Sequence, residues 1–550
     1  QVKPIVLNRR IEVTPEPHFD ASALPFEALT VSEMLGSNQP DLEKFLTRVY
    51  RCVAHSSPIN EKVNALSYFE TLCCDTASAN VLINSSLMTL FVRMLRASKA
   101  PALRVRLTSV MGLLLRHATY VTEELAASGV VAVLTECLKD ANERVRRRAA
   151  ATLGELLFYI ATQQHEAAES RRRGGDANET RDGKGGSRGT REEGAENDAA
   201  RAAAAAAAAA SAWKIPASTV GAVCRALRAG EDEIAQHYAV KTIENIVSHG
   251  GEWSAKFVRE ETLASLVAIM TSARDEQLRG TAASTLARAA RASPELTRRV
   301  LEKYGVQLLV AGLQDPSVKA QQACLNLLIR GVGELGARAV KDALAEHRGG
   351  GATPGSLGSA AAGPSGAGSG LSPLPHLATL LERGNATLRA KALLAMAALI
   401  RRDARWLLAL CARTEKALPL LDRVAKEKDP YVRKCLACLQ AAVAATVPEI
   451  HARVLADVQR RKALHRANAA ATVSRELREE FREKNQVGGN PLALFPAVAL
   501  AVGCASLRGA QTCDDAFARD VAALLDAASD ASGSFPGSEQ FKADLLALLE

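Results

Sequence analysis

A short motif recurs along this chain about every forty residues, and it restricts the fold more than any other feature. In each copy a polar loop ends, a Val, Leu or Ile is followed by Arg or Lys, and small and apolar residues then alternate at helical spacing. Clear copies occupy Leu138–Leu157, Met270–Ala289, Leu313–Arg330, Leu381–Ile400 and Ala425–Val443, and looser copies occupy Leu95–Leu115 and Leu227–Val247. One such unit cannot bury its apolar face alone, so we expect the units to stack on one another.

The apolar residue before the Arg or Lys marks an anchor position in each copy. The anchors are Val63, Val105, Val145, Ile234, Leu278, Val318, Leu388 and Val432. They lie 42, 40, 89, 44, 40, 70 and 44 residues apart, and each of the two long gaps contains a low-complexity insert. Removing the inserts restores a period typical of armadillo (ARM) and HEAT repeats. The predicted fold class is therefore all-α: an ARM/HEAT-type α-solenoid, a right-handed superhelix of helical hairpins with a long groove and two disordered inserts.

Composition supports a helical, soluble protein. Hydrophobic residues make up 48% of the chain but aromatic residues only 4%, and Ala, the best helix former, dominates together with Leu. No run of alternating β-branched residues indicates a strand. The net charge of +9 favours acidic partners such as tubulin tails, nucleic acid, anionic lipid or acidic protein segments.

The eleven cysteines are scattered through helical segments and indicate free thiols in a reducing compartment. Cys435 and Cys438 form a single CxxC without a second pair, so we interpret them as core residues. The longest apolar stretch, Pro491–Leu507, contains two prolines and is short for a membrane span. The chain starts at Gln1 without a visible signal peptide, which is compatible with a fragment. We expect a cytosolic protein without a membrane span.

Changes in composition divide the chain into eight predicted segments. These are an extended lead-in at 1–30, repeats at 31–164, a charged and poly-Ala insert at 165–212, repeats at 213–348, a Gly/Ser/Pro loop at 349–372, repeats at 373–447, a long basic helix at 448–485 and a C-terminal helical segment at 486–550. The inserts have too little apolar surface to fold by themselves. We expect the three repeat blocks to form one continuous stack.

Enzymatic motifs are missing from the sequence. It has no GxxxxGK[ST] loop, no protein-kinase set, no GxSxG and no HExxH, and its ten histidines are dispersed. We therefore expect no catalytic residue, no cofactor and no bound metal.

Clusters of basic residues are the functional feature that composition exposes. The candidate residues for binding an acidic partner are Arg144, Arg147, Arg148, Arg401, Arg402, Arg405, Arg460, Arg461, Lys462 and Arg466. The alternative interpretation of each is a solvated face or a helix-end charge. The cations that directly follow the anchors are interpreted as structural ties between loops: Arg146, Arg279, Lys319, Arg389 and Arg433. Because the clusters lack interleaved aromatic residues, nucleic-acid binding is disfavoured.

Two segments resemble a known family. The opening Val2–Glu12 (VKPIVLNRRIE) is similar to the stretch that follows the kinase domain in Fused/RUNKEL-type kinases, and Ser109–Gln163 is similar to their first well-marked armadillo segment. In that family a kinase or pseudokinase domain precedes a long ARM/HEAT region, and members are associated with microtubule arrays, cytokinesis and cilia. This chain contains no kinase domain, so no catalytic residue can be carried over.

The resemblance implies a non-catalytic scaffold that directs such a kinase to microtubules or their protein partners, in the cytoplasm or at the cytoskeleton. A regulatory tail of a protein whose main activity is ATP-dependent phosphorylation is the alternative. A karyopherin-like transport adaptor is a third class, but it would need regular Trp and Asn ladders, and the chain has only Trp213, Trp253 and Trp406.

Overall fold

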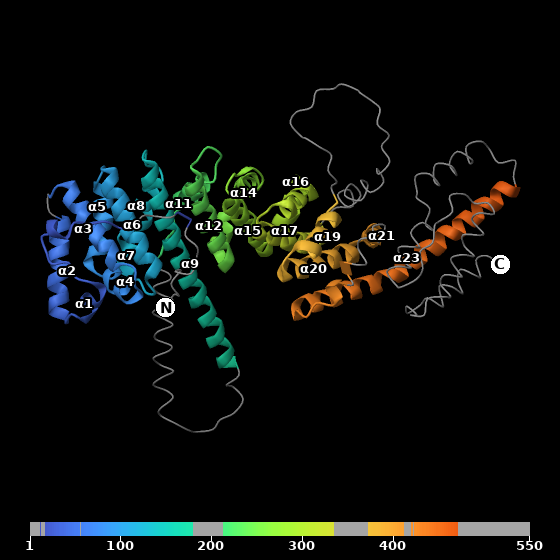
Figure 1. Cartoon of the computed structure of the whole chain (residues 1–550), viewed down its shortest axis with the longest axis horizontal. Helices are drawn as coiled ribbons and strands as arrows, with labels where there is room; N and C mark the ends of the chain where they lie inside the picture. Colours follow the sequence, from blue (N-terminus) through green and yellow to red (C-terminus); the bar gives the residue numbers. More distant parts are fainter. Residues whose placement is uncertain are drawn as a thin grey trace, which may run out of the picture. The chain divides into compact units, whose positions relative to one another are not determined.

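The computed structural model describes residues 11–12, 17–54, 57–179, 213–334, 372–411, 420–421 and 423–470. Within these ranges the chain is built from helices and contains no β-strand, which confirms the all-α solenoid (Figure 1). The chain divides into two compact units, Gln1–Ala292 and Ser293–Glu550. The boundary falls between two helices of the repeats and at neither insert, and each unit is described by itself below.

Unit 1 contains a short 3-10 helix and fourteen α-helices in its described residues. In chain order they are η1 (Ala21–Ala23), α1 (Val31–Gly36), α2 (Gln39–Ala54), α3 (Ile59–Leu72), α4 (Thr76–Ile83), α5 (Ser86–Ala97), α6 (Pro101–His117), α7 (Glu123–Ala127), α8 (Val130–Cys137), α9 (Glu143–Glu179), α11 (Ala217–Arg225), α12 (Glu233–His249), α13 (Gly251–Phe257), α14 (Glu260–Ser272) and α15 (Glu276–Ala292). Unit 2 contains α16 (Pro294–Gln314), α17 (Val318–Gly331), η2 (Val332–Glu334), α19 (Leu374–Arg383), α20 (Ala386–Arg402), α21 (Arg405–Cys411) and α23 (Pro430–Ala470).

The complete repeats have three helices, so the structure adds a short first helix to the predicted hairpin. The triplets α4–α5–α6, α7–α8–α9 and α13–α14–α15 show this order. The first helix has only five to eight residues in these repeats, too few for its periodicity to stand out in the sequence. Gly129 joins α7 to α8 at φ 77°, and Gly305 kinks α16 at φ 69°, so glycine makes the turn into the second helix.

The third helices of successive repeats pack directly on one another. In unit 1 the order is α3, α6, α9, α12 and α15, and in unit 2 it is α17, α20 and α23. We call the row in unit 1 the third-helix ladder. The pairs α9–α12 and α17–α20 each lie on opposite sides of an insert, so the stack continues past both inserts as the restored period predicts.

The anchor positions show why these helices begin where they do. An Asn or Asp before the helix accepts a hydrogen bond from the amide of the third helical residue, and that residue is buried. This arrangement confirms Val145, Leu278, Leu388 and Val432, each no more than 3% exposed. The other four anchors, Val63, Val105, Ile234 and Val318, do not stand at the third helical residue, and Val63 is the fifth residue of α3. Leu103 replaces Val105, Ala235 replaces Ile234 and Ala320 replaces Val318, which is the first residue of α17 and 45% exposed.

Small residues allow the ladder to pack closely. A Cβ at Gly112 of α6 would lie 2.7 Å from Oγ1 of Thr152 in α9, and a Cβ at Gly154 of α9 would lie 2.5 Å from Oγ1 of Thr242 in α12. Thr152 donates a hydrogen bond across the same contact to the carbonyl of Thr108, 2.7 Å away. Buried hydroxyls thus find backbone acceptors, while glycine admits the neighbouring helix.

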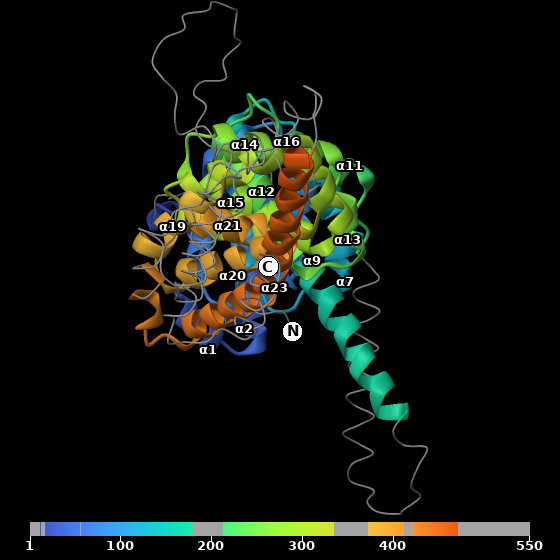
Figure 2. The same ribbon diagram turned by 90° about the vertical axis from the view of Figure 1, so that its right-hand side faces the viewer.

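Two predicted segment boundaries differ from the structure, and part of the lead-in packs where an extended linker was expected. Residues 17–30 of the lead-in pack on the first repeats, where Asn64 of α3 exchanges two hydrogen bonds with the backbone of Asp20 and the Tyr68 hydroxyl bonds the backbone of Leu29. Helix α9 continues past residue 164 to Glu179, and its C-terminal part extends beyond its neighbours (Figures 1 and 2). Helix α23 runs through Pro448, where a boundary between repeats and basic helix was expected. The predicted Gly/Ser/Pro loop, apart from Ser372, and the segment 486–550 lie outside the described residues.

One stretch of α23, Pro430–Ala452, is long and apolar enough to cross a membrane, and α4 with α5 passes the same test only as a pair bent by 67°. In the structure Val432, Leu439 and Val447 of this stretch are buried, and α23 packs on α20. This is the behaviour of a core helix in a repeat protein.

Candidate protein-binding surface

A row of ion pairs links neighbouring helices of the third-helix ladder. Arg106 of α6 lies 2.8 Å from the carboxylate of Glu70 on α3, and Arg116 lies 3.2 Å from that of Glu155 on α9. Farther along, Glu244 of α12 accepts from Lys241 at 2.7 Å and faces Arg288 of α15 at 3.6 Å. The side chains of Glu70 and Glu244 are at most 5% exposed. A buried carboxylate that lost its cation would be left as an uncompensated charge, so these cations are held within the ladder.

Glu155 has an unusual protonation behaviour. Burial raises the pKa of Glu155 to about 7, although Arg116 and Lys241 both favour its charged form. The loss of hydration therefore outweighs two cations at this position. Glu155 can change charge near neutral pH in the middle of the ladder.

Arg147 is tied to the start of the next repeat. Its Nε and Nη2 atoms donate to the two carboxylate oxygens of Asp232, each at 2.7 Å, in the forked geometry that arginine prefers. Asp232 also accepts from the amide of Ala235 and so caps α12. Burial opposes the charged form of Asp232, but these hydrogen bonds outweigh it and lower the pKa of Asp232. Arg147 therefore has a structural partner 85 residues away, across the first insert.

Arg144 is the most accessible cation of this cluster, and Arg148 is as exposed as Arg147, at 22% and 23% of their side-chain surfaces. Arg144 is exposed. Arg148 lies 3.4 Å from Oε2 of Glu12 in the lead-in, and Arg147 lies 4.0 Å from Oε1 of the same carboxylate. The carboxylate of Glu12, from the N-terminal part of this chain, thus lies beside two of the predicted residues.

The other predicted cations lie in unit 2. Arg401 and Arg402 are exposed at the end of α20, and Arg405 forks onto the carboxylate of Asp403, with its Nη2 atom 2.6 Å from Oδ2. Arg460, Arg461, Lys462 and Arg466 lie on the last turns of α23, and their side chains are outside the described part. The structure thus gathers the unit 1 cluster on one helix and spreads the unit 2 candidates over the ends of α20 and α23.

Three of the five cations that follow the anchors have structural contacts, two with the loop before their own helix and one with the next repeat. Arg146 donates to the carbonyls of Asp140 and Ala141, and Arg279 donates to those of Ala273 and Arg274, at 2.9 to 3.0 Å. Arg389 reaches the next repeat, 2.7 Å from Glu427. In α17 the equivalent contact comes from Gln321, which donates to the carbonyl of Asp315, because the anchor is Ala320. Arg433 is exposed.

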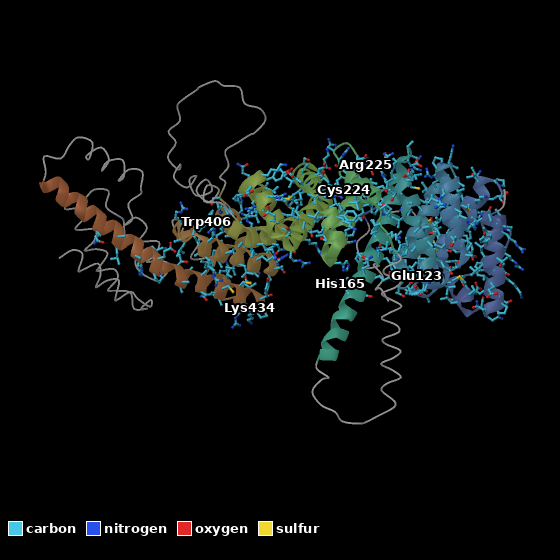
Figure 3. The ribbon with its side chains drawn as sticks, turned by 180° about the vertical axis from the view of Figure 1, so that it is seen from behind. Glu123, His165, Cys224, Arg225, Trp406 and Lys434 are labelled. Atoms are coloured by element: carbon cyan, nitrogen blue, oxygen red, sulfur yellow. The ribbon has the colours of Figure 1, made fainter. Side chains whose placement is uncertain are left out.

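Two features of this surface were missed from the sequence. Asp232 was not singled out, although an Asp immediately before a helical pattern is a capping signal. Glu12 was assigned to an extended lead-in, and no local signal connects it to α9. Figure 3 labels His165 at the place where α9 leaves the packed helices; its ring lies 5.5 Å from that of His249 on α12, a second link across the first insert.

The described residues contain no group of three or more His, Cys, Asp or Glu side chains that could hold a metal ion. Cys435 is 2% exposed, in agreement with the predicted core role, whereas Cys438 is only half-buried. The arrangement offers paired charges and helix faces, which suit recognition of another chain.

The comparisons with known proteins place this chain among kinase relatives. It is 30% identical over 96% of its length to the serine/threonine-protein kinase RUNKEL of Arabidopsis thaliana, and 25% identical over 59% of its length to the serine/threonine-protein kinase ULK4 of Mus musculus. The predicted resemblance is confirmed. The chain spans about a third of RUNKEL and about a fifth of ULK4, at 34% and 22% of their lengths. It is a repeat region related to parts of these kinases.

No family model matches the chain. Among solved structures, an engineered protein matches 91% of this chain and 98% of its own length, with a TM-score of 0.49 and 14% identity. A designed armadillo repeat protein in complex with the peptide (KR)4 matches 52% of this chain and 98% of its own length, with a TM-score of 0.37 and 15% identity.

Proposed function

We propose that this chain is a non-catalytic, protein-binding arm of a RUNKEL-type kinase and directs that kinase to microtubules or to proteins associated with them, in cytokinesis or in cilia. The observation that carries the proposal is the carboxylate of Glu12 beside Arg147 and Arg148. It supports a surface on α9 that accepts acidic groups of an extended polypeptide. The similarity to RUNKEL and ULK4 supports the link to a kinase.

An acidic partner fits this surface for electrostatic reasons. The chain carries a net charge of +9, and Arg144, Arg401 and Arg402 are exposed in addition to Arg148, which is partly exposed. Tubulin tails are extended and rich in carboxylates, so they match both the sign and the form of the ligand. Such binding weakens with salt, because the Debye length falls to about 8 Å at physiological ionic strength. A cytoplasmic location at a microtubule array or cilium follows from the proposal.

Co-sedimentation of the purified full chain with stabilised microtubules tests direct binding. We expect the wild type to pellet at low salt and to bind at least about tenfold more weakly at 0.15 M salt. The double variant Arg144→Glu/Arg148→Glu should lose binding while its helical circular dichroism is unchanged. Arg147 is left intact because it holds Asp232. Microtubules whose acidic tails have been removed by subtilisin serve as the control, and they should bind the wild type as poorly as intact microtubules bind the variant.

Failure of the wild type to pellet even at low salt would overturn direct binding. The alternative would then gain weight, in which the chain is a regulatory tail of a protein that mainly phosphorylates other proteins. That alternative predicts that adding or removing this chain changes the phosphorylation rate of the attached kinase and leaves its location unchanged.

A further inference from the structure

The lead-in of this chain contacts the third-helix ladder at two places that are two repeats apart. Asp20 exchanges hydrogen bonds with Asn64 on α3, at 2.8 and 2.9 Å. Eight residues earlier, Glu12 lies beside Arg147 and Arg148 on α9. Helix α6 packs between α3 and α9. The lead-in therefore meets the face from which the predicted binding residues emerge.

The first contact anchors the lead-in firmly. The Phe19 ring packs edge-on against Tyr68 with 5.2 Å between the ring centroids, and the Tyr68 hydroxyl both donates to and accepts from the backbone of Leu29 at 2.8 Å. Phe26 is 8% exposed and packs on the same ring. This anchor keeps Glu12 near α9 at a high local concentration.

The second contact is incomplete. Oε2 of Glu12 is buried and accepts no hydrogen bond from the described residues, although Nη2 of Arg148 is 3.4 Å away. The Nε and Nη2 atoms of Arg147 donate to Asp232, and its Nη1 atom lies 4.0 Å from Oε1 of Glu12. A buried acceptor without a hydrogen bond is energetically unfavourable, so a better-placed carboxylate can replace this one. The geometry is that of an occupied site whose occupant can be exchanged.

We propose that the lead-in is a resident, displaceable occupant of the third-helix ladder, held at its anchor on α3 and exchanged at Glu12 by an acidic segment of a partner protein. That the partner is an acidic segment rests on the proposed function. That the lead-in occupies the site rests on the contacts in the structure alone. The lead-in then lowers the apparent affinity of the site for a partner, because the partner must compete with a tethered carboxylate.

Binding of the chain's own segment in trans tests the occupant. The probe is a fluorescein-labelled peptide of residues 5–18. The protein is the full chain, either as wild type or with Glu12→Arg, in which Arg147 and Arg148 repel the tethered residue and leave the site open. We expect the probe to bind the Glu12→Arg chain at least about tenfold more tightly than the wild type, because a short tether gives an effective concentration in the millimolar range. Equal binding to both chains, or binding to neither, would overturn the proposal.

A charge swap separates this site from nonspecific attraction. In the Glu12→Arg background, Arg148→Glu should abolish binding of the probe. In the chain that keeps Glu12, the carboxylate introduced by Arg148→Glu repels the tethered Glu12, so this variant should bind a matched peptide that carries Arg at position 12. Arg51→Glu in the Glu12→Arg background is the control, because Arg51 is an exposed cation on α2 outside the predicted binding residues, and it should leave probe binding within about twofold. Residues 5–18 carry two arginines and two glutamates, so the probe has no net side-chain charge. Loss of binding in the control as well would mean that the position of the cation does not matter, and the proposal would be wrong.

Competition completes the test. Oligoglutamate should displace the probe from the Glu12→Arg chain and oligolysine should not. If oligoglutamate fails to compete, the site does not take acidic segments and the exchange step is wrong. None of these measurements uses microtubules, so a failure of the proposed microtubule function leaves their outcome intact.

Discussion

Gly154 lies where α9 crosses α12, and its missing side chain is what lets the two helices meet. A Cβ at this position would lie 2.5 Å from Oγ1 of Thr242, a distance that real contacts do not show. We expect Gly154→Ala to lower the free energy of unfolding by about 1 to 3 kcal/mol, the usual effect of overpacking a close contact. Thermal and urea unfolding of the full chain would measure the loss.

Two further variants make this prediction specific. Gly221 lies in α11, and a Cβ there would meet only Nη1 of Arg225 at 3.7 Å, so Gly221→Ala should stabilise the chain by about 0.5 to 1 kcal/mol through helix propensity. Adding Thr242→Ala to Gly154→Ala should recover part of the loss. Similar effects of Gly154→Ala and Gly221→Ala would show that the crossing is less tight than described.

The raised pKa of Glu155 predicts that the free energy of unfolding depends on pH. The folded chain keeps Glu155 protonated up to a pKa of about 7, whereas the unfolded chain has the ordinary value of 4.5. The folded state thus binds more protons between these two values, so the free energy of unfolding should fall as pH rises from about 4.5 to 7 and stay flat above. One pKa unit corresponds to about 1.4 kcal/mol, so the change amounts to a few kcal/mol at most.

Denaturant titrations at pH 5 and pH 8 would measure this dependence. The Glu155→Gln variant has no titrating group at the position and should lose that component of the pH dependence. It should be closest to the wild type, or less stable, at pH 5 and gain relative to it at pH 8. A wild type and variant that differ by the same amount at both values would contradict the raised pKa.

The predicted binding residues show what a sequence can and cannot reveal about a site. Composition located the cluster at Arg144–Arg148, and the structure does place those residues on one helix. Their partners could not be predicted, because Asp232 and Glu12 are far away in the chain. Whether an arginine meets such a partner depends on the rotation of α9 against α12, and no local pattern encodes that rotation.

Among the elements, α9 and α12 share one carboxylate that both caps a helix and holds a cation of the other helix. Asp232 caps α12 through the amide of Ala235 and holds Arg147 by two hydrogen bonds of 2.7 Å. We expect Asp232→Ala to cost about 1 to 3 kcal/mol of unfolding free energy, since it removes a cap and leaves a partly buried cation without its partner. Hydrogen exchange should rise at the start of α12 and in the facing turn of α9.

Asp232→Asn is the matched control. Asparagine can still accept from the amide of Ala235, but it loses the charge that Arg147 meets. Its stability should lie between those of the wild type and the alanine variant, with exchange at the start of α12 close to the wild type. If both variants were as stable as the wild type, the contact would be unimportant.

The helices themselves were predictable to different degrees. The third helices carry long apolar patterns, so their positions followed from the sequence. The exact first residues of these helices did not follow from the sequence. The buried position is the third residue after the cap, and in two helices it is Ala235 or Ala320, without the Val or Ile that marks an anchor. The passage of α23 through Pro448 was missed because proline normally ends a helix, whereas here the apolar face continues to Ile450, which is 2% exposed.

For the whole molecule, the period of the repeat was enough to predict the class of fold but not its division. A repeat contacts only its neighbours, so a period in the sequence translates directly into a stack in space. The division into two units at Ala292 and Ser293 left no mark in the composition, since the repeat motif continues across it. The inserts, by contrast, are conspicuous in the sequence and leave the packing of the third helices unbroken.

The paired hydrogen bonds between Arg147 and Asp232 have a consequence for how the polypeptide can be divided and produced. Since α9 and α12 recognise each other through side chains on both sides of the first insert, the covalent connection between them is not what aligns them. We expect that the chain can be opened inside the insert and produced as two polypeptides that associate with each other. Each half would then act as a reporter of the other, and a split fluorescent protein fused to the cut ends would light up where the halves reunite in a cell.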